Sequence, residues 1–265
     1  ALSKARVPEA KEALLFIKRN DSAVMMDQVR AMFGLVTRDD VGHELATELA
    51  SDVRKHAAKR SHDHDFLAGE SMLALSTMSG LRDDSTIAAT SRQALEETVS
   101  TSPLASQTLK VALHAIGNTG DPGMLPMVGG YTDAPDIDTR KAAAHAFSRM
   151  PAAVADPLEL AWLKRETSPF VKKEMYRVFQ QQHLDLNQGA SRELVEHTLA
   201  ELPTVKAAYT RKHMVLLVAQ SSVAKEPDIR RRLVEQAKWE RARGTVLLNQ
   251  FATILTRDEI AEVLR

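Results

Sequence analysis

The tightest cluster of residues with chemically useful side chains runs from Ser61 to Asp65, in the order Ser-His-Asp-His-Asp. Imidazole nitrogens and carboxylate oxygens bind zinc and similar cations, which makes His62, His64 and Asp65 candidate metal ligands. In an extended segment, the alternation of side chains points both histidines to the same side. However, no third ligand follows at a suitable spacing, and Asp65 precedes a helical pattern, where a carboxylate acts as a cap. We therefore expect a capped helix and predict no metal ion and no cofactor.

Three further motifs match catalytic signatures only in part. The segment 117–123 lacks the strand of a dinucleotide-binding fold and the lysine of a phosphate-binding loop, and it indicates a helix cap at Gly117 followed by a turn. Ser71 lacks the second glycine of a nucleophile elbow, and the Ser-x-x-Lys spacing at 222–225 lacks its partner motifs. The chain has no cysteine, which excludes a thiol nucleophile and cysteine-ligated metal sites. We predict that the protein is not an enzyme.

The elements that must position these residues are helices. Apolar residues recur at three- and four-residue spacing, and no stretch alternates as a half-buried strand does. The turns carry Ser, Thr or Asp, and we predict Thr37 and Asp136 as helix caps. The longest apolar stretch, Met214 to Ala219, is far shorter than the roughly 20 residues of a membrane span, so we predict none. The clearest periodic positions are Val41, Leu45, Leu49 and Val53; Leu109, Leu113 and Ile116; Ala143, Ala146, Phe147 and Met150; and Val171, Met175, Val178 and Phe179.

The helical segments also repeat along the chain. Residues 111–116 resemble 142–147 at an offset of 31, and residues 140–147 resemble 172–179 at an offset of 32. His114 and His145 thereby occupy equivalent places, which indicates a recurring exposed or groove-lining position. Alanines on the buried faces let helices approach closely, and a helix pair buries both faces only when another pair stacks on it. We predict an all-α, right-handed superhelix, a solenoid of about 12 to 14 helices forming one domain over residues 1–265; a compact bundle is the alternative.

Charge is balanced overall but not along the chain. Lys and Arg number 35 and so do Asp and Glu, which excludes a strongly basic nucleic-acid binder. Residues 203–265 nevertheless carry 12 basic residues against 7 acidic ones. A solvated helix face interleaved with Glu235 and Glu240 is one interpretation, and a surface for an acidic partner, anionic lipid or nucleic acid is the other. The candidate partner-binding residues are Arg230, Arg231, Arg232, Lys238, Arg241 and Arg243, together with His114 and His145.

Two segments carry a resemblance to a known family. Residues 111–122 (VALHAIGNTGDP) and 139–147 (TRKAAAHAF) resemble successive HEAT-type repeats. They are similar in particular to the helical domain of the large lipid transfer proteins, the vitellogenin and microsomal triglyceride transfer protein family. Residues 165–172 (RETSPFVK) and 73–78 (LALSTM) are similar to further segments of that domain, and the likeness extends over residues 10–185. It implies a curved, two-layered helical arch that wraps lipid-bearing sheets and serves as a protein interface.

The expected function is that of a non-enzymatic scaffold or interaction domain. The resemblance implies the helical arch of a vitellogenin-like lipid transport protein; a free-standing HEAT-repeat adaptor is the alternative, and a HEAT-fold nucleic-acid-binding protein comes third. Expected partners are another protein or neighbouring domains of the same chain, with lipid reached through a larger parent protein. The chain opens Ala-Leu-Ser without an initiator methionine, as expected of part of a longer protein. A lipid-transfer role implies a secreted or extracytoplasmic protein, and an adaptor role a cytoplasmic one.

Overall fold

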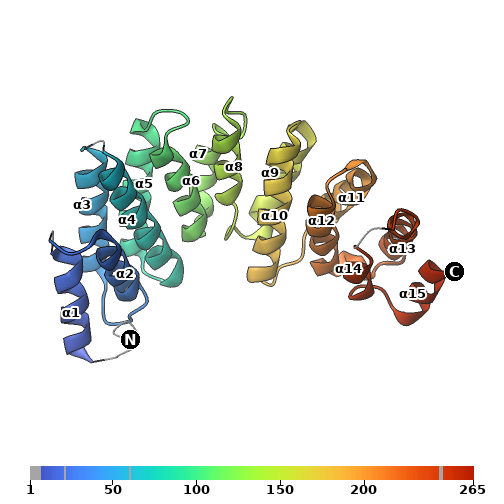
Figure 1. The fold of residues 1–265 in the computed structure, drawn as a ribbon, viewed down its shortest axis with the longest axis horizontal. Coiled ribbons are helices and arrows are strands. Elements are labelled where there is room, and N and C mark those ends of the chain that lie inside the picture. Colours follow the sequence, from blue (N-terminus) through green and yellow to red (C-terminus); the bar gives the residue numbers. More distant parts are fainter. Residues whose placement is uncertain (1–6, 21, 60, 245–246) are drawn as a thin grey trace. The chain divides into compact units, whose positions relative to one another are not determined.

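The chain is helical throughout its described regions. The computed structural model describes residues 7–20, 22–59, 61–244 and 247–265. Across these residues there are fifteen α-helices and a few short 3₁₀ turns, with no strand (Figure 1). The all-α prediction is therefore confirmed, although the helix number exceeds the predicted 12 to 14 because α7 and α14 are short additional helices. No helix within these described ranges is long and apolar enough to cross a membrane.

The helices group into two compact units, Ala1–Ala146 and Phe147–Arg265. A single repeat domain over residues 1–265 thus stays a prediction. The helices of the first unit are α1 (Pro8–Arg19), α2 (Met25–Val36), α3 (His43–Ala57), α4 (His62–Leu81), α5 (Ser85–Thr101), α6 (Gln107–Thr119), α7 (Leu125–Gly129) and α8 (Ile137–His145). Those of the second are α9 (Ala152–Arg165), α10 (Pro169–Asp185), α11 (Arg192–Glu201), α12 (Ala208–Gln220), α13 (Pro227–Ala242), α14 (Leu248–Ala252) and α15 (Arg257–Leu264).

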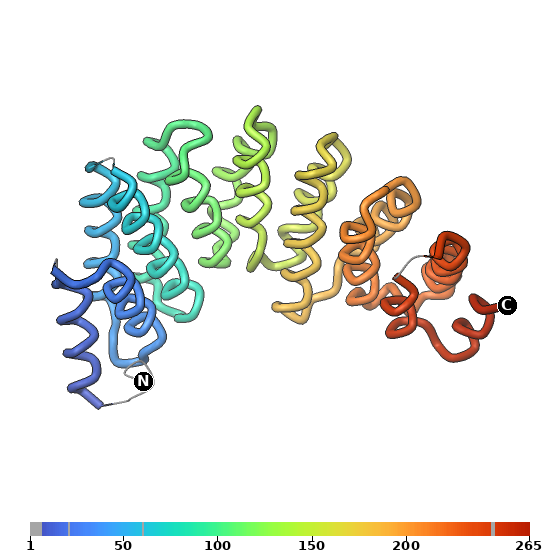
Figure 2. The backbone as a smooth tube through the Cα atoms, in the orientation of Figure 1, coloured from blue at the N-terminus to red at the C-terminus, as the bar shows by residue number. Residues whose placement is uncertain are grey.

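Within each unit the helices contact their neighbours in two series. In the first unit, α2, α4, α6 and α8 contact one another in that order, and α3 contacts α5. In the second unit, α10, α12 and α14 form one series and α9, α11, α13 and α15 the other. Hairpin pairs such as α3 with α4 and α11 with α12 join the two series, as the trace within each unit shows (Figure 2). We call the two series the even layer and the odd layer.

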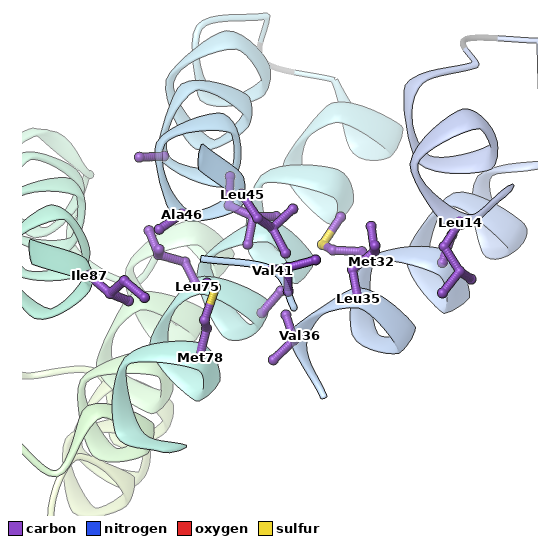
Figure 3. Packing of buried hydrophobic residues seen from close by; sticks show 14 of the residues in the cluster. Leu14, Met32, Leu35, Val36, Val41, Leu45, Ala46, Leu75, Met78 and Ile87 are labelled. Carbon is purple, nitrogen blue, oxygen red and sulfur yellow. The ribbon is translucent and has the colours of Figure 1, made fainter. Parts of the chain in front are cut away.

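The core of the first unit lies between these layers. Leu35, Leu49 and Met78 are fully buried there, and the side chains from α2, α3 and α4 converge in Figure 3. Each such side chain contributes about 2 kcal/mol through removal of its apolar surface from water. Every periodic apolar position singled out in the sequence is buried, in both units. The helices approach closely where residues are small: a Cβ at Gly69 of α4 would lie only 3.4 Å from Val111 Cγ1 of α6.

The helix caps agree only in part with the sequence predictions. Asp136 caps α8 as predicted, since its Oδ2 accepts hydrogen bonds from Thr139 N at 2.9 Å and Thr139 Oγ1 at 2.7 Å. The prediction for Thr37 is wrong, because its hydroxyl donates to Gly34 O and closes the end of α2, while Gly42 precedes α3. The predicted cap at Gly117 is also wrong: α6 continues to Thr119, and Gly120 adopts the left-handed φ of 65° that ends it.

Ion pairs at a constant sequence spacing link one helix pair to the next. Among the described residues, five pairs join a basic side chain to an acidic one 29 positions later. In each case the acid lies on or just before a helix of the following pair. The five pairs are Arg19–Glu48, Arg92–Asp121, Lys172–Glu201, Arg211–Glu240 and Arg230–Glu259.

Candidate functional site

Two carboxylates and an imidazole meet inside the second unit, between α9 and α10. Asp156 and Glu159 lie three residues apart on one face of α9, and His183 lies near the end of α10. Their side chains are 3%, 0% and 1% exposed respectively. One potential ligand atom from each lies within 4.8 Å of the other two. Among the residues that the structure describes, this is the one group of three with ligand atoms arranged to hold a metal ion.

Hydrogen bonds to the following loop orient two of the three side chains. His183 Nδ1 lies 3.1 Å from Gln188 O, and because a carbonyl oxygen only accepts, Nδ1 carries a proton. The lone pair of the neutral ring is then on Nε2, the nitrogen on the side of Asp156. Asp156 Oδ2 accepts from Ser191 N at 2.5 Å, so its other oxygen, Oδ1, is the one available to the cluster.

The atoms that face the middle of the cluster lack partners. His183 Nε2 and Asp156 Oδ1 are 3.3 Å apart, yet neither makes a hydrogen bond of normal geometry with any described residue. Neither oxygen of Glu159 makes a hydrogen bond of normal geometry with a described residue, although the Gln182 side chain lies close enough to favour the charged form of the carboxylate. Burial, reinforced by the charge of Asp156, raises the pKa of Glu159 well above its usual value. Such groups are costly to bury alone, by several kcal/mol for a charge, so this arrangement requires compensation.

The loop 186–191 holds these orienting groups in place. Asn187 adopts a left-handed φ of 50°, which reverses the chain after α10. At Gly189 the backbone passes so close to the start of the next turn that a Cβ would lie 3.0 Å from Ser221 Cα. Ser221 Oγ also donates to Ala190 O at 2.5 Å. The positions of Gln188 O and Ser191 N relative to the cluster are therefore fixed by packing.

The cluster is suited to binding a metal cation or a proton and not to acting on a dissolved substrate. Two acidic oxygens and an imidazole nitrogen converge there with complementary charge for a cation or proton. All three side chains are almost completely buried, so a soluble substrate has no contact with them in this conformation.

The candidate metal ligands His62, His64 and Asp65 do not converge on a common site. His62 begins α4, so the segment is helical and not extended, and residues two apart on a helix point in different directions. His62 is exposed, whereas His64 Nδ1 lies 2.8 Å from His56 Nδ1 of α3. The expected cap at Asp65 is also wrong, because the residue lies within the first turn and Ser61 occupies the cap position.

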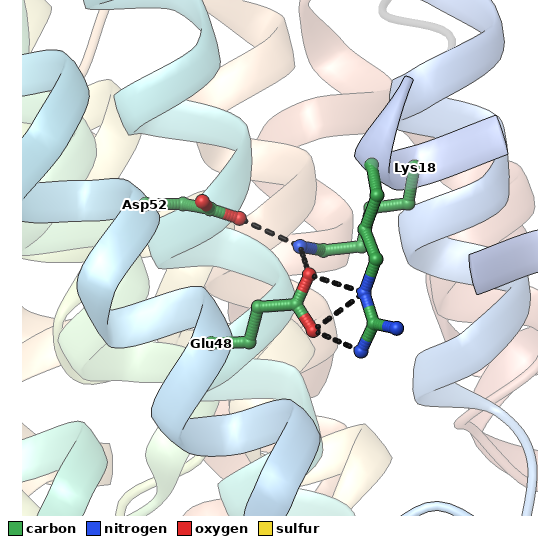
Figure 4. A network of polar contacts seen from close by, with 4 residues as sticks. Lys18, Glu48 and Asp52 are labelled. Atoms are coloured by element: carbon green, nitrogen blue, oxygen red, sulfur yellow. Dashed lines mark hydrogen bonds and ion pairs between the residues drawn. The ribbon is translucent and has the colours of Figure 1, made fainter. Parts of the chain in front are cut away.

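A charged cavity lies beside that histidine pair, among α1 to α4. Lys18 is buried there, with its Nζ 2.6 Å from Glu48 Oε1 and 2.7 Å from Asp52 Oδ2 (Figure 4). Arg19 binds the same Glu48 carboxylate. Although burial acts in the opposite direction, hydrogen bonds from Arg19 and Lys18 hold the pKa of Glu48 below its usual value. The cavity has a volume of about 610 Å³ and is lined by both basic and acidic side chains.

Three of the predicted basic partner-binding residues of α13 face α15. Arg230 pairs with Glu259 and donates to Ile254 O, Lys238 pairs with Glu262, and Arg241 donates to Val263 O. These contacts hold α15 against α13 within the second unit.

The other three basic residues point elsewhere. Arg232 donates to Glu196 O of α11, Arg243 lies over the Trp239 ring at 4.1 Å, and Arg231 is exposed. The six residues therefore do not form one continuous open surface, and partner binding by them stays a prediction.

The two repeat-related histidines do lie together. The rings of His114 on α6 and His145 on α8 stack with centroids 3.8 Å apart and planes inclined by 20°. Both side chains are half-buried, at the contact between two successive helices of the even layer. Equivalent residues of stacked repeats are neighbours, so this contact agrees with the repeat seen in the sequence. A role in partner binding stays a prediction.

Comparison of the chain with protein-family models, with curated proteins and with solved structures gives no match. The site residues must therefore be interpreted from their own geometry. Sequence reasoning missed Asp156, Glu159 and His183, although one signal was present. Glu159 lies between the buried Ala155 and Trp162 at helical spacing, so it is an acid on an apolar helix face.

Proposed function

We propose that this chain is an α-solenoid that acts as a non-enzymatic interaction scaffold. The observation that carries the proposal is the order in which helices contact one another within each unit. In each series, a helix contacts the next helix of the same series. The five ion pairs at a spacing of 29 support it, because each of them links one helix pair to the following one. Stacking of this kind produces extended surfaces that bind other proteins.

The even layer of the second unit offers a surface of suitable composition. Phe170 at the start of α10 is 63% exposed, and Tyr209 at the start of α12 is 48% exposed. Lys173 Nζ lies 4.9 Å from the Tyr209 ring centroid, so an aromatic and a cationic group are presented together. Exposed aromatic side chains are enriched at protein interfaces, and we infer that a protein partner binds here.

The specific setting is proposed from the sequence resemblance. In that setting the chain forms the helical arch of a vitellogenin-like lipid transport protein, with the HEAT-like superhelix cradling other domains. A free-standing adaptor is the alternative for the same surface. The third candidate, nucleic-acid binding, is the least favoured, because Arg230, Lys238 and Arg241 are engaged with α15.

Small-angle X-ray scattering tests the solenoid. A compact globule of this length has a radius of gyration of about 18 Å. A solenoid is more extended, so we expect a value clearly above that figure at several protein concentrations. A radius of gyration at about 18 Å would contradict the proposal.

Affinity capture from the native source tests the scaffold function. The variant Phe170→Ala/Tyr209→Ala should lose a stoichiometric partner that the original chain retains. Phe16→Ala is the matched control, because Phe16 is 70% exposed but lies on α1 of the other unit. Equal recovery of all partners by the variant and the control would refute the assignment of this surface. Mass spectrometry of the captured material distinguishes the settings, since lipid bound to the native full-length protein is expected only of the lipid transport setting.

A further inference from the structure

We propose that Asp156, Glu159 and His183 bind one zinc ion inside the second unit. One nitrogen and two carboxylate ligands make a donor set that suits Zn²⁺, a borderline cation that accepts imidazole and carboxylate together. The ion joins α9 to α10 and neutralises two buried acids. It would serve as a structural element of the unit and is independent of the partner surface proposed above.

The orientation of His183 is the first observation that carries this assignment. Histidines that bind metal typically donate the proton of their other ring nitrogen to a carbonyl or carboxylate, which presents the lone pair to the ion. His183 does this through Nδ1 and Gln188 O. Asp156 is oriented in the same way, since Ser191 N holds Oδ2 and leaves Oδ1 on the cluster side.

The distance between the two ligand atoms is the second observation. Zinc–ligand bonds of about 2.0 to 2.1 Å at a tetrahedral angle place neighbouring ligand atoms roughly 3.3 Å apart. His183 Nε2 and Asp156 Oδ1 are 3.3 Å apart, and their mutual geometry is not that of a hydrogen bond. The two atoms are therefore placed like two ligands of one ion, and they do not form a hydrogen bond with each other.

The third observation is Glu159, whose two oxygens find no hydrogen-bond partner among the described residues. Burial favours the protonated form of Glu159, but a proton on this carboxyl would contact only one of its two neighbours in the cluster. The ligand atoms of all three side chains lie within 4.8 Å of one another, so small side-chain movements would bring all three onto one divalent cation. Burial of the site implies that the ion enters during folding or local opening and exchanges slowly.

Zinc binding is measured on the full chain after removal of metal with a chelator. The protein is equilibrated with equimolar zinc, manganese and magnesium, desalted, and analysed by mass spectrometry for bound metal. We expect one zinc per chain, and less than about a tenth of that in Glu159→Gln and in His183→Gln. Co²⁺ in place of zinc should give visible absorption bands that both variants lose.

Three controls separate this site from other residues. Glu193→Gln changes an exposed acid of α11, His213→Gln changes a histidine outside the cluster, and His56→Gln/His64→Gln removes the histidine pair of the first unit. All three should retain one zinc. Zinc at one hundred times its Kd should also raise the melting temperature of the original chain by several degrees, and not that of Glu159→Gln.

Three results would overturn the proposal. The first is no zinc above the level of Glu159→Gln in the original chain. The second is preferential uptake of magnesium, and the third is loss of zinc in the His56→Gln/His64→Gln variant with retention in His183→Gln. Circular dichroism of each variant before loading establishes that it is folded.

Discussion

Removal of one partner from the buried Arg211–Glu240 ion pair should strongly destabilise the second unit. Arg211 of α12 is 3% exposed and Glu240 of α13 is 0% exposed. Two bonds join them, from Nε to Oε1 at 2.7 Å and from Nη2 to Oε2 at 3.1 Å. Arg211 Nη1 also donates to the carbonyl oxygens of Val205 and Lys206. The guanidinium therefore compensates both a buried carboxylate and two backbone acceptors ahead of α12.

The variant Arg211→Met leaves Glu240 buried without its cation. Breaking a buried pair in this way costs about 3 to 5 kcal/mol, because the remaining carboxylate stays buried without its guanidinium partner or must be protonated. The double variant Arg211→Met/Glu240→Leu removes both charges, and we expect it to cost less than about 2 kcal/mol. The coupling energy between the two sites is then at least about 1 kcal/mol. Its sign shows that the unpaired buried charge of Glu240 causes the loss of stability in Arg211→Met.

Equilibrium unfolding in urea, followed by tryptophan fluorescence, measures these free energies. Both tryptophans of the chain, Trp162 and Trp239, lie in the second unit, so the signal reports on that unit alone. Glu196→Gln is the control, because it breaks a half-exposed pair with Arg192 and should cost less than about 1 kcal/mol. A loss below about 1 kcal/mol in Arg211→Met would refute this reasoning, and so would a double variant whose loss equals the sum for Arg211→Met and Glu240→Leu measured separately.

Three other variants test local features of the fold. Asp136→Ala should cost about 1 kcal/mol through loss of the α8 cap. The hydrogen bond from Thr139 lowers the pKa of Asp136 to about 2 from 3.8. The stabilisation by the charged carboxylate is therefore present above about pH 4 and is lost as the pH falls towards 2. In an acid titration followed by circular dichroism, the stability difference between Asp136→Ala and the original chain should narrow between about pH 4 and pH 2. Gly189→Ala should cost about 1 to 3 kcal/mol in urea unfolding, because its Cβ meets the backbone of Ser221. Arg230→Ala removes the pair with Glu259, and hydrogen exchange of α15 should accelerate while that of α12 stays unchanged.

A charge-reversed triple variant of Arg230, Arg231 and Arg232 would not test partner binding cleanly. Arg230 holds α15, so its reversal would disturb the fold as well as the surface. Arg231→Glu alone changes an exposed residue and is the better probe.

The sequence alone determined the local features of this protein. Helical periodicity is a property of residues three and four apart, so the buried positions of α3, α6 and α10 follow from their spacing. The cap at Asp136 could be predicted because it involves a residue three positions later. Caps at Thr37 and Gly117 could not be placed, since one or two residues decide where a helix ends and several were suitable.

The tertiary structure decided which side chains meet. Asp156 and His183 come together because of the packing between α9 and α10 and the course of the loop 186–191. Likewise His64 meets His56 and not His62, and Arg230 meets Glu259 of a helix that the charge pattern alone did not connect to it. Such meetings depend on the register of one helix against another, which many weak contacts fix jointly. No short stretch of sequence contains that register, and so the candidate site emerged only from the fold.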